Sequence, residues 1–363
     1  MTERTRKLEA PHRRLESNPP RVVEKAAVVG YRSAAAVLAF APPALSRSVI
    51  ATASQLSYLA WPAKRRAVDA NFGHVLGLRP EDRRVRRMAL RAYREYARYM
   101  VELMRLPSRP REELVGAVEG DDVERLAALW RESGRAMIVV AAHVGNNEAV
   151  GAAIADRGYP ASVIADDSSF PELFELLRRQ RETWGVTLIP WRNLRELFGV
   201  LKRREILALL VDWGYRSDGI PVRLFDAWTT LPAGPATLAA KTGALIAPLA
   251  IQRTASGRFR IEAHDPFTVD SSDPAALQRG TQRIADALQA TIAAAPAQWY
   301  SFKPMWPDDA AEQRELERRA LAMLSGAADP GPGSGAGSPA GAPLEPAAGA
   351  SAEPAGDPAG AST

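Results

Sequence analysis

The sequence has 363 residues, of which 46% are hydrophobic and 25% charged, values typical of a chain that folds into one or two globular domains. This composition excludes both wholesale disorder and a protein built mainly from membrane-spanning helices. Cysteine is absent, which excludes disulfides, thiolate zinc sites and cysteine nucleophiles, so any catalysis must use oxygen, nitrogen or backbone groups.

The net charge of +5 is unevenly distributed along the chain. Residues 61–111 contain 14 Lys and Arg against 5 Asp and Glu, so this stretch alone exceeds the surplus of the whole chain. A concentrated basic surface favours a polyanionic partner, and both nucleic acid and anionic lipid meet that requirement. The neighbouring residues must therefore distinguish between them.

The segment before the basic stretch favours lipid. Between Arg32 and Lys64 the only charged residue is Arg47, which leaves uncharged runs of 14 and 16 residues. Neither run reaches the ~20 residues that a spanning helix needs. Pro42 interrupts the segment, and Trp61 stands at its basic boundary, as is typical of a membrane interface. We predict a helical hairpin on an anionic membrane surface and no nucleic-acid partner; the alternative is a buried helix pair in a soluble domain.

Residues 85–106 have the periodicity of a strongly amphipathic helix. Its apolar positions recur at intervals of three and four: Ala89, Tyr93, Tyr96, Met100 and Leu103. Aromatic residues at helical spacing are more typical of core packing than of a surface that stacks on nucleic-acid bases. We therefore predict that this helix packs against the rest of the fold.

From residue 136 onward, short runs rich in Val, Ile and Leu alternate with helical stretches. The expected strands are residues 136–142, 162–165, 186–190, 206–212 and 244–251. Two alternating segments, 222–225 and 259–263, are expected as edge or antiparallel strands. The pattern predicts an α/β fold with a largely parallel central sheet that is covered by helices on both faces. In such folds the chemistry collects beyond the carboxyl ends of the strands.

The first of these strands runs directly into a turn that contains His143. Gly145 permits a tight turn, and Asn146 or Asn147 can cap the helix that follows. Because His143 and Glu148 stand five residues apart across the turn, we expect Glu148 to hold one imidazole nitrogen while the other faces a substrate hydroxyl. The alternative is a histidine that only satisfies the end of a strand or helix.

A second candidate, Asp212, ends the strand expected at 206–212 and precedes a Pro-Ala-Gly sequence at 232–234 that introduces a helix. We expect Asp212 and His143 to share one cleft, although Asp212 as a plain cap or surface ion pair is an alternative. The sequence has no HExxH, Walker A, dinucleotide GxGxxG or GxSxG motif, which argues against a metal site, kinases, Rossmann dehydrogenases and serine hydrolases.

Residues 143–148 resemble the HX4D/E signature of the membrane glycolipid acyltransferases, which include late lipid A acyltransferases and bacterial phosphatidylinositol mannoside acyltransferase. Further segments appear in the family's order: Glu119-Gly120 before a helix, RRQRETWG at 178–185, Asp212 after a strand, LPAGPATLAAKTGA at 231–244 and QWYSFKPMW at 298–306. The resemblance covers roughly residues 21–307 and includes the membrane-associated hairpin. Unlike the commoner family form, which has Trp or Phe before the motif acid, this sequence has Asn147 there.

The resemblance implies roles for four residues: His143 as catalytic base, Glu148 as its carboxylate partner, Arg181 as the active-site arginine, with Arg178 and Arg179 as alternatives, and Asp212 as the acid of the second motif. It implies O-acyl transfer from acyl-CoA or acyl carrier protein, a thioester co-substrate rather than a cofactor, to a hydroxyl of a membrane glycolipid. The acceptor would be phosphatidylinositol mannoside-like or lipid A-like. The alternative is a catalytically inactive, membrane-bound lipid-binding or scaffold protein with the same fold.

We expect four segments along the chain. Residues 1–24 form a basic flexible N-terminus, 25–111 a helical membrane-associated region, 112–325 the α/β catalytic domain, and 326–363 a disordered tail rich in Gly, Ala, Pro and Ser. The expected location is the cytoplasmic face of the inner membrane, as a peripheral or monotopic protein.

Overall fold

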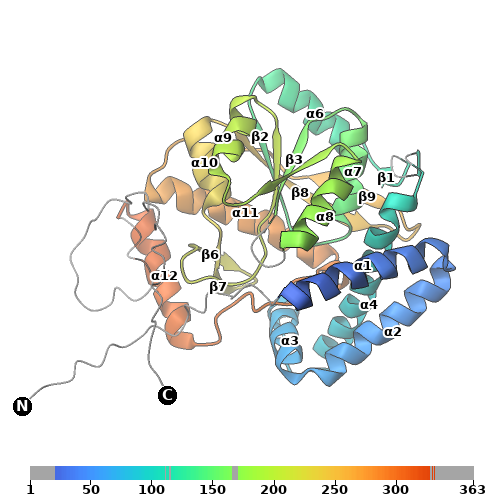
Figure 1. The fold of residues 1–363 in the computed structure, drawn as a ribbon. Coiled ribbons are helices and arrows are strands. Elements are labelled where there is room, and N and C mark those ends of the chain that lie inside the picture. Colours follow the sequence, from blue (N-terminus) through green and yellow to red (C-terminus); the bar gives the residue numbers. More distant parts are fainter. Residues whose placement is uncertain are drawn as a thin grey trace, which may run out of the picture.

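The structure, a computed structural model, describes residues 21–110, 112, 113, 116–165, 171–327, 329 and 331 (Figure 1). Most of the expected flexible N-terminus and disordered tail, residues 1–20 and 332–363, lies outside the described residues. The last four residues of the expected flexible N-terminus, 21–24, belong instead to the first helix, α1 (Arg21–Phe40).

Seven strands form the central sheet in the order β1-β9-β8-β2-β5-β3-β4. They are β1 (Val118–Glu119), β2 (Met137–Ala141), β3 (Ala161–Ala165), β4 (Val186–Pro190), β5 (Ile206–Leu210), β8 (Leu245–Arg253) and β9 (Phe259–Ala263). All neighbouring pairs are parallel except β8 and β9. The five expected strands and the antiparallel segment at 259–263 are confirmed, whereas the two-residue strand β1 is too short to leave a pattern in the sequence.

Helices cover both faces of the sheet, as expected. They are α6 (Asp122–Ser133), α7 (Asn147–Asp156), α8 (Pro171–Glu182), α9 (Leu194–Lys202), α10 (Gly234–Thr242) and α11 (Pro274–Ala294), whereas α12 (Ala310–Leu324) packs on α11. On β2, Ile138 and Val140 join the core formed with α9, α10 and α11, whereas Met137 joins a second core with α6 and α7. Because both faces of β2 are buried, its sequence is apolar throughout.

The expected edge segment at 222–225 is also a strand, but it does not join the central sheet. It is β6 (Ile220–Leu224), which pairs antiparallel with β7 (Ala227–Leu231) in a separate two-stranded sheet packed against α11 and α12. Strand β7 was not expected from the sequence.

Four helices form the N-terminal region: α1, α2 (Pro43–Ala60), α3 (Pro62–Leu76) and α4 (Arg83–Arg105). The chain continues through the short helix η1 (Leu106–Ser108), and a second short helix, η2 (Pro296–Gln298), follows α11. The aromatic stripe of α4 packs in the core, as expected: the ring of Tyr93 lies 5.2 Å from that of Tyr58 and 4.6 Å from that of Phe302.

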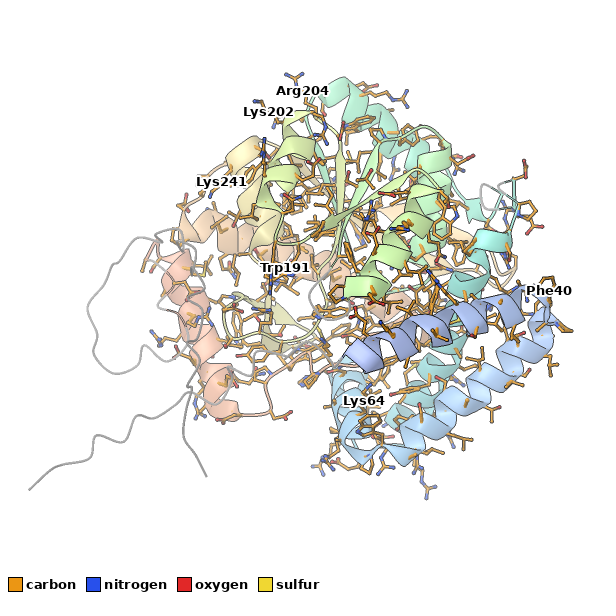
Figure 2. All side chains as sticks on the ribbon, viewed as in Figure 1. Phe40, Lys64, Trp191, Lys202, Arg204 and Lys241 are labelled. Carbon is orange, nitrogen blue, oxygen red and sulfur yellow. The ribbon has the colours of Figure 1, made fainter. Side chains whose placement is uncertain are left out.

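The consecutive helices α1 and α2, called the hairpin below, both pack on α4 but are not fully buried. One face packs on α4, while the other exposes eight large apolar residues at or near the hairpin: Val29, Val37, Phe40, Leu45, Val49, Leu56, Leu59 and Trp61. Phe40, at the tip of the hairpin, is 92% exposed (Figure 2). Among the described helices, none combines the length and apolar character needed to cross a bilayer.

Polar contacts fix α1 beside α8 (Figure 1). The buried carboxylate of Glu24 accepts a hydrogen bond of 2.6 Å from the backbone N–H of Glu172, in the first turn of α8. Near the other end of α8, the hydroxyl of Tyr31 donates to Gln180 at 3.1 Å. The hairpin is therefore packed on the helix that carries Arg181.

Candidate active site

The site begins where two neighbouring strands end. Strands β2 and β5 are parallel and in register, with Ala141 opposite Leu210, so His143 and Asp212 each lie two residues beyond a strand end and come together. Nδ1 of His143 lies 2.7 Å from Oδ1 of Asp212. The backbone N–H of His143 also donates to the two carboxylate oxygens, at 3.1 and 2.9 Å. The structure therefore brings His143 and Asp212 together at the ends of neighbouring strands.

The prediction that Glu148 holds an imidazole nitrogen of His143 is wrong. Glu148 lies in the first turn of α7, and its carboxylate pairs with the guanidinium of Arg181 from α8, through Nε at 2.8 Å and through a second hydrogen bond from Nη2. Asp212 holds the imidazole instead. Spacing along the chain placed Glu148 near the histidine, but the partner comes from the next strand of the sheet, which spacing alone does not reveal.

The pairing also distinguishes among the three arginines of α8. Arg178 and Arg179 both bind Glu175 on their own helix, whereas Arg181 reaches across to Glu148. Burial disfavours the charged guanidinium of Arg181, but the Glu148 carboxylate outweighs this effect and raises the pKa of Arg181. Within the described residues Nη1 of Arg181 makes no hydrogen bond, so one edge of the guanidinium stays available to a ligand.

Asp212 is only 1% exposed, and further donors satisfy its carboxylate. The indole N–H of Trp299 donates to Oδ2 at 2.8 Å, and the Ser301 hydroxyl donates to the backbone carbonyl of Asp212 at 3.1 Å. Trp299 was not expected as a site residue, although it lies in the QWYSFKPMW segment. It is 87 residues from Asp212 in the chain, so only the fold brings the two together.

The pair has the electrostatics of an oriented base. Burial by itself would lower the pKa of His143, but the charge and hydrogen bond of Asp212, aided by the charge of Glu148, raise it. Burial would likewise raise the pKa of Asp212, but His143 lowers it, together with its own backbone N–H and Trp299. With Nδ1 engaged, Nε2 is the remaining ring nitrogen and has no hydrogen-bond partner among the residues that the structure describes. The imidazole is thus arranged to accept a proton at Nε2.

The turn between β2 and α7 depends on Gly145 and two asparagines. Gly145 has a φ of +70°, and a Cβ there would lie 2.5 Å from the backbone oxygen of Ile251. Asn146 caps α7 by accepting from the N–H of Ala149 at 3.0 Å. Asn147 donates to the carbonyl of Ala142 at 3.2 Å, which closes the turn around His143.

Helix α4 supports this turn through buried charge. The Asn146 amide donates to Glu102 at 3.0 Å, and the same carboxylate oxygen of Glu102 accepts from Arg253 at 2.6 Å. The Arg253 side chain is 2% exposed and projects from the end of β8. The helix that follows the hairpin therefore helps to fix the cap of α7.

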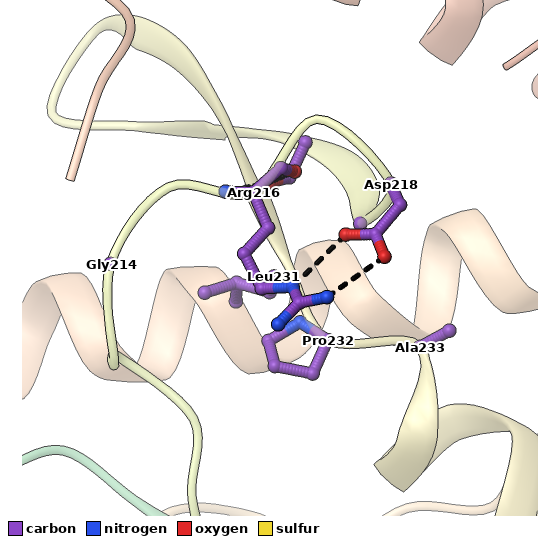
Figure 3. Close-up of a pocket in the computed structure, with 8 residues that line it drawn as sticks. Gly214, Arg216, Asp218, Leu231, Pro232 and Ala233 are labelled. Atoms are coloured by element: carbon purple, nitrogen blue, oxygen red, sulfur yellow. Dashed lines mark hydrogen bonds and ion pairs between the residues drawn. The ribbon is translucent and has the colours of Figure 1, made fainter. Parts of the chain in front are cut away.

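A pocket of about 230 Å³ begins two residues after Asp212 (Figure 3). Its lining comes from the loop before β6, the end of β7 and the segment that joins β7 to α10: Gly214, Arg216, Asp218, Gly219, Thr230, Leu231, Pro232 and Ala233. Arg216 and Asp218 pair across it through two hydrogen bonds of 3.0 Å. Over the described ranges, no three His, Asp or Glu side chains are grouped as metal ligands would be.

Comparisons with known proteins find relatives that match most of the chain. The model of a family described as bacterial lipid A biosynthesis acyltransferase matches residues 21–307. A phosphatidylinositol mannoside acyltransferase of Mycolicibacterium smegmatis is 27% identical over 292 residues, which cover 79% of this chain and 93% of that protein. A protein of the same name from Mycobacterium tuberculosis is 28% identical over 237 residues, 62% of this chain and 72% of the relative. The resemblance seen in the sequence is confirmed.

Replacing Gly145 tests whether the turn positions the site. Gly145→Ala should lower the free energy of unfolding by about 2–4 kcal/mol, because the new Cβ meets the Ile251 backbone and favours negative φ. The matched control is Gly151→Ala in α7, where a Cβ would make only an ordinary contact of 3.9 Å with Val186, so the helix should gain up to about 1 kcal/mol. Urea unfolding measures both variants. Equal stability of the two would contradict the described turn.

Proposed function

Because this chain belongs to the bacterial lipid A biosynthesis acyltransferase family, we propose that it moves a fatty acyl chain from acyl-CoA or acyl carrier protein to a hydroxyl of a membrane glycolipid. The protein is an acyltransferase. The names of its mycobacterial relatives favour a phosphatidylinositol mannoside-like acceptor over a lipid A-like one. The observation that carries the mechanism is the 2.7 Å contact between Nδ1 of His143 and Asp212, which leaves Nε2 to act as a base.

In the proposed reaction, Nε2 of His143 removes the proton from the acceptor hydroxyl as its oxygen attacks the thioester carbonyl carbon. Asp212 keeps the proton of Nδ1 in a hydrogen bond and stabilises the imidazolium that forms. As the carbon–sulfur bond breaks, the imidazolium returns its proton to the thiolate. The acyl chain passes directly to the acceptor, and no covalent acyl-enzyme is needed.

The resemblance implied that Glu148 is the partner of His143, but we propose that it acts together with Arg181. The carboxylate binds Nε and Nη2 along one edge of the guanidinium, so the orientation of Arg181 is fixed while Nη1 remains available. We propose that the guanidinium of Arg181 stabilises the negative charge that develops on the thioester oxygen or binds a phosphate of the donor. In this account Glu148 positions Arg181 and does not contact the base.

The inactive lipid-binding protein remains the competing hypothesis, and it requires a turn that no longer supports chemistry. The departure from the family form at Asn147 does not disrupt the turn, because this side chain donates back to the Ala142 carbonyl. The contact between His143 and Asp212 and the pair of Glu148 and Arg181 are both present. These contacts support turnover, which an assay of donor consumption tests.

We further propose that the hairpin places the enzyme on an anionic membrane, at the cytoplasmic face. In the chain the hairpin is followed by a group of exposed basic residues on α3 and α4: Lys64, Arg66, Arg83, Arg84, Arg86, Arg87, Arg91 and Arg94. Insertion of apolar side chains and attraction of basic ones to anionic headgroups reinforce each other. Because α1 packs on α8, this arrangement would bring the lipid acceptor close to Arg181 and the base.

Variants of three site residues test the assigned roles. His143→Ala and Asp212→Asn should each lower kcat by ~10²-fold or more, because general-base catalysis depends on both the base and its orientation. Arg181→Ala should lower kcat/KM for the donor at least ~10-fold, because the developing negative charge is then no longer stabilised. Steady-state assays with acyl-CoA and phosphatidylinositol mannoside in mixed micelles measure these effects.

The matched control for Arg181→Ala is Arg178→Ala, which removes an arginine from the same helix that binds only glutamates of α8. This variant should retain nearly wild-type kinetics. Near wild-type turnover of a folded His143→Ala protein would contradict the proposed mechanism. Equal losses in Arg178→Ala and Arg181→Ala would refute the assignment of Arg181.

The membrane proposal is tested on the exposed face of the hairpin. Val37, Phe40 and Val49 are 65%, 92% and 58% exposed, so replacing all three by Ser should leave the fold intact. It should weaken binding to vesicles of equal parts phosphatidylglycerol and phosphatidylcholine by ~10-fold or more, because each inserted side chain contributes about 1.5–3 kcal/mol. The control replaces Leu194, Leu321 and Leu324, which are exposed elsewhere. Equal co-sedimentation of both triple variants would contradict the proposal that the hairpin contacts the membrane.

A further inference from the structure

We propose that Trp213 and Lys303 form the subsite that binds the phosphorylated sugar headgroup of the acceptor; this inference rests on the proposed function. Trp213 directly follows Asp212, and its ring centroid lies 5.6 Å from that of His143. Its side chain is nevertheless 55% exposed. A large indole ring that stays exposed beside a base offers an apolar surface to the C–H face of a sugar ring.

Lys303 supplies the charge for the phosphate. Its Nζ lies 4.3 Å from the centroid of the Trp213 ring. The stem of the side chain passes Gly214, where a Cβ would lie only 3.1 Å from the Cβ of Lys303. Within the described part of the chain, no carboxylate pairs with this ammonium group. The indole and the cation therefore form a joint surface for a ring that carries a negative charge.

Both residues are held by segments attached to Asp212. Lys303 lies in the segment whose Trp299 and Ser301 bind Asp212. The buried Asn71 of α3 fixes the same segment, because its amide donates to the carbonyl of Lys303 at 2.8 Å and its oxygen accepts from the N–H of Met305 at 3.0 Å. A platform fixed in this way loses little freedom when a ligand binds.

The position of this surface favours the acceptor over the nucleotide of the donor. The group beside the base must present the hydroxyl that Nε2 of His143 deprotonates. The nucleotide of acyl-CoA is separated from the thioester by the full pantetheine arm, so it cannot lie next to His143 while the thioester reacts there. The pocket that begins at Gly214, with Arg216 in its wall, provides space for the rest of the headgroup.

Kinetics with two acceptors test the sugar and phosphate contacts separately. Phosphatidylinositol mannoside contains both groups, whereas mannosyl diacylglycerol lacks the phosphate. Trp213→Ala should raise the KM for both acceptors by about 10-fold, and Trp213→Phe should restore part of the loss. Lys303→Met should raise the KM about 5- to 10-fold only for the phosphate-bearing acceptor. The KM for acyl-CoA should change less than twofold in each variant.

The matched control is Trp191→Ala. Trp191 is 46% exposed after β4 and has the guanidinium of Arg192 5.0 Å from its ring, so it repeats the pairing of an exposed indole with a cation elsewhere on the surface (Figure 2). This variant should keep the acceptor KM of the wild type. An equal rise of KM in the Trp191 and Trp213 variants would overturn the subsite, as would an unchanged KM in Trp213→Ala.

Calorimetric titration with the deacylated headgroup, glycerophosphoinositol mannoside, separates this inference from the proposed function. Wild-type binding that weakens about 10-fold in Trp213→Ala, without any acyl transfer, would support the subsite and refute the reaction. Acyl transfer with the same headgroup affinity in both proteins would support the reaction and refute the subsite. Absence of both binding and transfer in the wild type would refute both.

Discussion

The hydrogen bond between His143 and Asp212 is the interaction on which the site depends. It forms because β2 and β5 are adjacent, parallel and in register, so two residues far apart in the chain leave the sheet side by side. A buried carboxylate is costly unless donors surround it, and here the imidazole, a backbone N–H and the indole of Trp299 supply them. The same contacts that stabilise the buried charge also orient the base.

This requirement extends the site well beyond the sheet. Trp299 lies in the segment that follows η2, and its indole N–H donates to Asp212. Asn71 of α3 holds the same segment by donating to the backbone carbonyl of Ser301. On the turn after β2, Glu102 of α4 binds Asn146. The N-terminal helices are therefore part of the framework of the site and not a detachable anchor. Loss of α3 or α4 would therefore disturb the segments that position His143 and Asp212.

Much of this architecture could be predicted from the sequence because burial on both faces makes the strands of a parallel sheet continuously apolar. The same pattern placed His143 and Asp212 at strand ends. The partner of the imidazole could not be predicted. Five-residue spacing suggested Glu148, whereas Asp212 is brought to His143 by the order of the strands, which local periodicity does not determine. The role of Trp299 was missed for the same reason. Strand β7 was missed because its pairing with β6, outside the central sheet, depends on long-range packing.

The central claim, that Asp212 and not Glu148 holds the base, is tested most directly by the pKa of His143. The sequence has four histidines, so their imidazole signals can be resolved by NMR in protein labelled with 15N-histidine. In the wild type this pKa should lie above the ordinary value of about 6.5. In Asp212→Asn it should fall below that value, since burial then acts without the opposing charge, whereas Glu148→Gln should lower it only slightly. A large fall in Glu148→Gln with no change in Asp212→Asn would contradict the account.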